Sequence, residues 1–257
     1  MAVTAAALVP HPPLLVPELG RGASPELDEL RSACRRALAA TLEQADALLV
    51  VGAAPSWGEA QPGAAASFAP YGAAVEVALP RAGPRGRPDH VLDCGRLPPG
   101  HLDELPLSLA VAAWLLSLEG AARQLPSVAA FGVPASLGSG RAVALGRALA
   151  GAVRAGRRAG LLVMGDLSAR RTPRAPAALH PGAAAFDQQV GDAIRKAEPA
   201  RLLDLDAEAA AELRVGGTAP LWLLAGAVEG AGALRGEVLY EAAPYGAGYL
   251  VGVLTLR

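Results

Sequence analysis

Short apolar runs alternate with longer segments of helical periodicity along most of the chain. The runs predict strands at 2–9, 47–51, 74–79, 127–133 and 160–164. Between them, apolar residues three and four positions apart predict helices at 25–45, 105–118, 141–155, 181–197, 206–213 and 220–228. Two further apolar runs, 233–240 and 248–256, follow each other directly and are separated by a short turn at 241–247.

This alternation predicts one α/β domain over residues 1–257, with a mostly parallel central sheet and helices on both faces. The run at 47–51 is apolar at every position, which is typical of a strand covered on both sides. The two consecutive strands at the C-terminus predict an antiparallel element in that sheet. Gly, Pro and polar residues predict loops at 52–70, 81–100 and 165–181.

Composition narrows the class of protein. The chain has 257 residues, of which 52% are hydrophobic, and a net charge of −1, so general disorder and a nucleic-acid backbone as partner are both disfavoured. Cys34 and Cys94 are too few for a disulfide framework. Residues 1–20 lack the cationic start of a signal peptide, and the longest apolar stretch, 105–118, is shorter than the roughly 20 residues of a membrane span. We expect a cytoplasmic protein without a membrane partner, and a homo-oligomer, most simply a dimer.

The candidate chemistry lies in four loops at the carboxyl ends of predicted strands, at 10–13, 52–55, 165–168 and 240–242. In open α/β sheets, ligands bind at these ends. His11 lies among prolines after the first strand, Asp166 and Ser168 follow the strand at 160–164, and Glu241 follows the strand at 233–240. Each has a structural alternative: His11 bonded to a strand-end carbonyl, Asp166 accepting from the Ser168 N–H, and Glu241 accepting backbone N–H groups in a turn.

Three sequence blocks at the same places resemble a known superfamily. They are residues 6–18 (AALVPHPPLLVPE), 165–168 (GDLS) and 240–249 (YEAAPYGAGY). In order and spacing they are similar to the class III extradiol ring-cleavage dioxygenases, which include the catalytic B subunit of protocatechuate 4,5-dioxygenase and Memo-like proteins. The resemblance implies an α/β subunit of that type and a non-haem Fe(II) oxidoreductase that acts on a small, catechol-like aromatic substrate.

The resemblance also implies roles for single residues. His11 matches the first iron ligand of the family and Glu241 the third, while Asp166, Ser168 and Tyr245 would line the substrate pocket. Two family positions are changed. The second ligand histidine falls in the segment 52–55, where Ala54 offers no ligand atom, and the catalytic histidine falls on Ala169, so no catalytic residue is assigned.

These changes leave two functions open. One is a metal-dependent oxidoreductase of the family type; the other is a non-catalytic or repurposed relative that acts as a binding or interaction protein. His90, His101 and His180 are the remaining imidazoles that could complete a site, and their distance from His11 and Glu241 distinguishes the two.

Two further groups of charged residues have open roles. Arg170, Arg171 and Arg174 form either an anion site or a solvated face, and the solvated face is favoured. Asp187 follows a phenylalanine in a predicted helix, and we expect its carboxylate at the helix surface or at the edge of the site.

Overall fold

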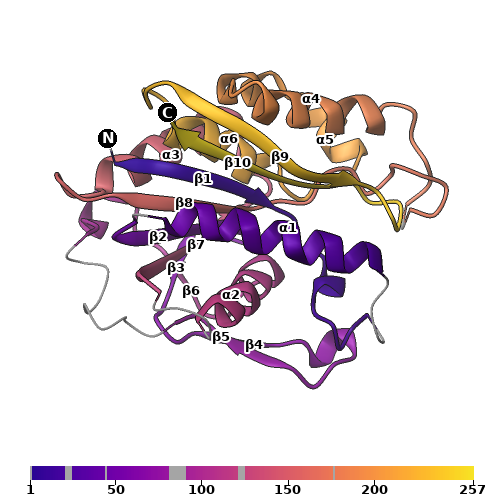
Figure 1. The fold of residues 1–257 in the computed structure, drawn as a ribbon, viewed down its shortest axis with the longest axis horizontal. Coiled ribbons are helices and arrows are strands. Elements are labelled where there is room, and N and C mark those ends of the chain that lie inside the picture. The colour runs from indigo at the N-terminus through magenta and orange to yellow at the C-terminus, as the bar shows by residue number, and fades with distance from the viewer. Residues whose placement is uncertain (1, 21–24, 44, 81–90, 121–124, 176) are drawn as a thin grey trace.

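The structure is a computed structural model, and it describes residues 2–20, 25–43, 45–80, 91–120, 125–175 and 177–257. The described residues form an eight-stranded sheet in the order β6-β3-β7-β2-β8-β1-β10-β9, with a separate two-stranded β4–β5 sheet (Figure 1). The strands are β1 Val3–Val9, β2 Ala47–Ala54, β3 Gly58–Ala60, β4 Ala65–Ser67, β5 Glu76–Ala78, β6 His101–Leu102, β7 Ser127–Pro134, β8 Ala159–Met164, β9 Leu234–Ala242 and β10 Tyr249–Leu256. The α-helices are α1 Pro25–Leu42, α2 Leu107–Gly120, α3 Ser139–Ala152, α4 Ala183–Arg195, α5 Ala207–Glu212 and α6 Thr218–Ala227.

Strand directions confirm the predicted fold class. The centre of the sheet is parallel, since β2 pairs in parallel with β7 and β8, and β8 pairs in parallel with β1. The last two strands are antiparallel: β10 pairs with β1, and β9 pairs with β10 and ends the sheet. At the other end, β3 runs antiparallel to β7.

Helices cover both faces of the sheet and bury its alternating apolar side chains. In β1, Ala7 and Val9 join the cluster beneath α1 and α2, whereas Leu8 points the other way and joins the cluster beneath α3, α4 and α6. We call these two sides the α1 face and the α6 face. The two faces can be followed in Figure 1, where α1 crosses one side of β1 and β8.

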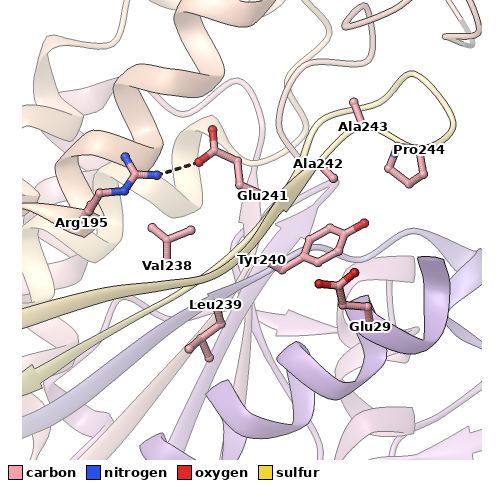
Figure 2. A pocket seen from close by; sticks show the side chains of 9 residues that line it. All are labelled: Glu29, Arg195, Val238, Leu239, Tyr240, Glu241, Ala242, Ala243 and Pro244. Atoms are coloured by element: carbon pink, nitrogen blue, oxygen red, sulfur yellow. Dashed lines mark hydrogen bonds and ion pairs between the residues drawn. The ribbon is translucent and has the colours of Figure 1, made fainter. Parts of the chain in front are cut away.

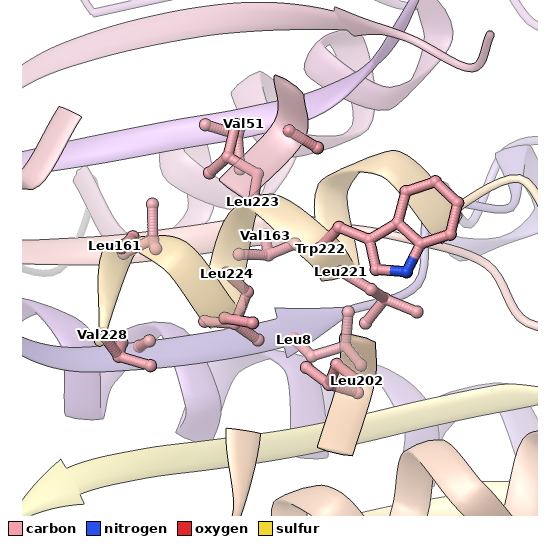
Figure 3. Close-up of a cluster of buried hydrophobic side chains, with 14 of the residues drawn as sticks. Leu8, Val51, Leu161, Val163, Leu202, Leu221, Trp222, Leu223, Leu224 and Val228 are labelled. Atoms are coloured by element: carbon pink, nitrogen blue, oxygen red, sulfur yellow. The ribbon is translucent and has the colours of Figure 1, made fainter. Parts of the chain in front are cut away.

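Helix α6 is buried on all sides because it is apolar all round. Leu221, Leu223 and Leu224 are 0–1% exposed and pack with side chains of the central strands such as Leu161 (Figure 3). Small residues let α3 approach α6 closely: a Cβ on Gly146 of α3 would overlap the α6 backbone.

The short strands were not predicted. The segment 52–70, expected to be a loop, contains the end of β2 together with β3 and β4. The strand expected at 74–79 shrinks to β5, which pairs with β4 outside the main sheet. These strands are three residues long and contain mostly small residues, so they carry no alternating pattern that could be recognised.

Two predicted loops, at 81–100 and 165–181, lie partly within the described residues. Within the loop expected at 81–100, residues 81–90 lie outside the described part, and 91–100 hold a short 3-10 turn at Cys94–Arg96. The loop expected after β8 has neither helix nor strand in its described residues, as predicted. In the described part of the chain, no helix combines the length and the apolar character needed to cross a membrane.

Candidate functional site

His11 and Asp166 meet at the carboxyl ends of neighbouring parallel strands. The prolines around His11 end β1, and Asp166 follows β8 after one glycine. The backbone N–H of His11 donates to Oδ1 of Asp166 at 2.7 Å, and the His11 Nδ1 lies 3.8 Å from the same oxygen. His11 is only 8% exposed, and its Nδ1 is buried without a hydrogen-bond partner. A buried polar atom left in this state is costly, which marks the pair as a candidate binding site.

The Asp166 carboxylate faces the α1 side of the sheet. Burial raises the pKa of the Tyr249 phenol on β10, and the negative charge of Asp166 raises it further, as do Tyr240 and Tyr245. Burial and then Asp166 likewise raise the pKa of the Cys34 thiol on α1. Asp166 and Tyr245 therefore both lie close enough to Tyr249 to influence its ionisation. The assignment of Asp166 and Tyr245 to one pocket stays a prediction, and Tyr249 was not among its residues.

Ser168 belongs to a different cluster, beneath the loop that follows β8. Its N–H donates to Oδ1 of Asp187 at 3.0 Å, and its hydroxyl accepts the N–H of Arg170 at 3.1 Å. The structural alternative in which Asp166 accepts from the Ser168 N–H is wrong. That N–H donates to Asp187, and Asp166 accepts from the N–H of His11. The serine is fully buried and its polar groups are used within the fold.

Asp187 is a buried carboxylate of α4, so of the two expected positions, the helix surface and the edge of the site, the helix surface is wrong. It is 1% exposed. The Nε of Arg171 lies 3.1 Å from Oδ2, but this oxygen has no hydrogen bond of good geometry. Burial raises the pKa of Asp187 to about 6, with a further increase from Glu241, against the lowering effects of the Ser168 N–H and Arg171.

This position could have been recognised from helical spacing. Asp187 lies four residues after Ala183 and three before Val190, so it falls on the stripe of α4 that packs against the sheet. The loop after β8 and Gly248, just before β10, lie against its carboxylate. Gly248 has no side chain at this point, and a Cβ there would overlap Oδ2 of Asp187.

Glu241 lies in β9 and not in the turn after it. It pairs in register with Leu250, and the turn begins later, where the N–H of Gly246 donates to the carbonyl of Ala243. Its Oε2 accepts from the Nη2 of Arg195 on α4 at 2.8 Å. Figure 2 shows Glu241 and Arg195 on one side of β9, while the neighbouring Tyr240 points to the other side, toward Glu29 of α1.

The two proposed iron ligands, His11 and Glu241, therefore lie in different surroundings. Asp166, the partner of His11, acts on groups of the α1 face, whereas Glu241 is held on the α6 face by Arg195. In the described part of the chain, no three His, Cys, Asp or Glu side chains lie close enough to hold a metal ion. Ala54, at the second ligand position, ends β2 and pairs with Pro134 of β7. This donor set does not fit an Fe(II) centre of two histidines and a glutamate.

The other histidines that are described have partners elsewhere. His101 lies on β6, five strands from β1, which corresponds to about 24 Å across the sheet. Its Nε2 lies 3.4 Å from Asp103. The Nδ1 of His180 accepts from the N–H of Gly182 at 3.1 Å. His90 lies outside the described residues.

The arginines beside the site are also used within the fold. Arg170 donates through Nε to the carbonyl of Ala178 and through Nη1 to that of Glu212, and Arg171 faces Asp187. Ala169 donates its N–H to the carbonyl of Leu213, and its methyl group cannot transfer a proton. Arg170 and Arg171 therefore hold the loop in place.

Comparison with known proteins supports the fold alone. No protein-family model and no curated protein sequence matches the chain. Among solved structures, it is similar to an uncharacterized protein, JW3007, from Escherichia coli K12, with a TM-score of 0.62 and 14% sequence identity. The match covers 98% of this chain and 99% of that one. A similar fold thus exists over nearly the whole length of another protein.

Proposed function

We propose that this chain is a repurposed relative of the extradiol dioxygenase scaffold, which binds a small aromatic ligand at the His11–Asp166 pair without a three-residue iron centre. The observation that carries the proposal is the position of Glu241, whose carboxylate is bonded to Arg195 on the α6 face. A guanidinium at 2.8 Å competes with any metal ion for that carboxylate. Ring cleavage of a catechol needs one metal that binds both the diol and O₂, and the described residues do not assemble three donors for such a metal.

The binding part of the proposal rests on the unsatisfied imidazole. The Nδ1 of His11 is buried without a hydrogen-bond partner, and a ligand hydroxyl beside it would satisfy that atom. Asp166 lies beside it, with 27% of its side chain exposed, and can accept a second ligand hydroxyl. Tyr245 is partly buried on the same face and adds apolar ring surface there, while Tyr249 is buried in the cluster behind it. Two adjacent hydroxyls on a flat ring match this arrangement. We also propose that the protein is cytoplasmic.

The test is a ligand titration in the presence of a chelator. 3,4-Dihydroxybenzoate is added to the protein with EDTA, and the ring signals of His11 are followed by ¹H–¹⁵N NMR. We expect saturable shifts, loss of binding in His11→Ala, weaker binding in Asp166→Asn, and unchanged affinity in Glu241→Gln. The Glu241→Gln variant is the matched control because it alters the other proposed ligand.

Two results would contradict the proposal. One is the absence of any shift in the NMR signals, which would show that the protein does not bind this aromatic ligand. The other is binding that appears only after Fe(II) is added and is lost in Glu241→Gln. This result would indicate an iron site that includes Glu241, as in the dioxygenases.

A further inference from the structure

Strand β9 is an edge strand that is open on its outer side. It pairs with β10, and no strand among the described residues pairs with its other side. The neighbouring helices pack on the two faces of the sheet and not across this edge. A Cβ on Gly236 would overlap the carbonyl of Ile194 at the end of α4, and Glu237 lies 3.8 Å from Arg36 of α1 on the opposite face. The outer backbone groups of residues 234–238, with which no other described strand pairs, are therefore available for another strand.

The surface beside this edge has room for an incoming strand. A hollow of about 690 Å³ follows the second half of β9, from Val238 to Pro244, between Arg195 and Glu29 (Figure 2). A second hollow, of about 470 Å³, begins at Leu234 and is lined mostly by apolar residues, among them Leu203, which is 42% exposed. Apolar surface thus lies beside the first residue of β9, where a partner could cover it.

The sequence of this edge is complementary to itself. Gly236 lies at the centre of the segment Leu-Arg-Gly-Glu-Val, with Arg235 and Glu237 on either side and Leu234 and Val238 beyond them. Side chains alternate along a strand, so Arg235 and Glu237 share the α1 face, while Leu234 and Val238 pack with the cluster of the α6 face. Two antiparallel copies centred on Gly236 place each Arg235 opposite a Glu237 and each Leu234 opposite a Val238.

Neighbouring registers are unfavourable. A pairing centred on Arg235 places two arginines opposite each other, and one centred on Glu237 does the same with two glutamates. A shift of one residue between the strands would place side chains of the α1 face opposite those of the α6 face. Charges on an edge normally prevent pairing, but here their opposite signs and symmetric positions favour a single two-fold arrangement.

We propose that two copies of this chain associate through β9, antiparallel and centred on Gly236, so that one continuous sheet of sixteen strands crosses the dimer. Each Arg235 then pairs with the Glu237 of the other copy. The pairing buries the open edge together with Leu234 and Val238. It is independent of the ligand proposed for His11 and Asp166.

The test measures the dissociation constant of the dimer by sedimentation velocity at about 1 to 100 µM protein. We expect a dimer for the wild type. Arg235→Glu and Glu237→Arg each place like charges opposite each other at two symmetric positions, and each should raise the dissociation constant roughly tenfold or more. The double variant, Arg235→Glu with Glu237→Arg, restores both pairs and should restore the dimer. Arg141→Glu makes the same charge change at an exposed site on α3 and should change nothing.

A second measurement does not depend on variants. Amide hydrogen exchange in β9 should slow as the protein concentration rises, because new backbone hydrogen bonds form along its outer edge. A monomer at all concentrations would overturn the proposal. So would a dimer that neither single variant weakens, or a double variant that stays as weak as the single ones.

Discussion

The raised pKa of the buried Asp187 carboxyl predicts how the free energy of unfolding depends on pH. Its pKa is raised from 3.8 to about 6 in the folded protein, chiefly by burial. Because the folded pKa is higher than the unfolded one, the folded state binds the extra proton. The protonated form therefore stabilises the fold below about pH 4, and this contribution is lost as the pH rises through about 6.

The size of the effect follows from the shift in pKa. A shift of about two units corresponds to on the order of 3 kcal/mol between the two limits, at 1.36 kcal/mol per unit. Between about pH 7.5 and 4.5, where the unfolded group is still largely ionised, the gain is about 2 kcal/mol. The variant Asp187→Asn keeps an acceptor for the Ser168 N–H but cannot titrate. The free energy of unfolding of the wild type should therefore rise relative to that of Asp187→Asn by this amount as the pH falls.

Urea denaturation followed by tryptophan fluorescence at several pH values measures this difference, and other titrating groups largely cancel between the two proteins. Arg171→Met removes the cation that opposes the shift, so it should move the transition to higher pH. A difference that does not change with pH would refute the reasoning. A difference that falls as the pH falls would show that the ion pair with Arg171 outweighs burial.

Three further predictions follow from local packing and exposure. Gly248→Ala should destabilise the protein by about 1–3 kcal/mol in urea denaturation, because its Cβ would overlap the buried carboxylate, whereas Gly140→Ala, in open space on α3, should stabilise it by about 0.5–1 kcal/mol; equal effects would contradict this. In the native protein, a thiol reagent should modify Cys94 and leave Cys34 unreacted until the chain unfolds, because Cys34 is buried and its pKa is raised; rapid loss of both thiols would contradict the burial. Arg195→Ala should change the free energy of unfolding by less than about 1 kcal/mol, because its ion pairs are solvent-exposed, and a larger loss would show that they are structural.

Most of the fold could be predicted because its main elements carry clear periodic patterns. The apolar run that became β2 and the consecutive runs that became β9 and β10 were sufficient to indicate a mixed sheet with an antiparallel end. The short strands β3 and β6 could not be predicted, because two or three residues carry no period and their pairing depends on distant partners.

The candidate site was predicted less completely. The carboxyl ends of neighbouring parallel strands meet at one edge of the sheet, which brings His11 to Asp166. This pairing was not predicted, because the resemblance paired His11 with Glu241. The side of the sheet to which the Glu241 side chain points could not be predicted. It depends on whether the residue lies in the strand or in the turn, and on Arg195, which is 46 residues away.

The most direct test of the account is the binding of Fe(II) by anaerobic equilibrium dialysis, with the wild type, His11→Ala and Glu241→Ala compared. The account predicts less than one bound Fe(II) per chain in the wild type, with no decrease in either variant, because Glu241 is bonded to Arg195 and no group of three ligands is assembled among the described residues. One Fe(II) per wild-type chain that is lost in both variants would contradict it, since His11 and Glu241 would then share a metal ion.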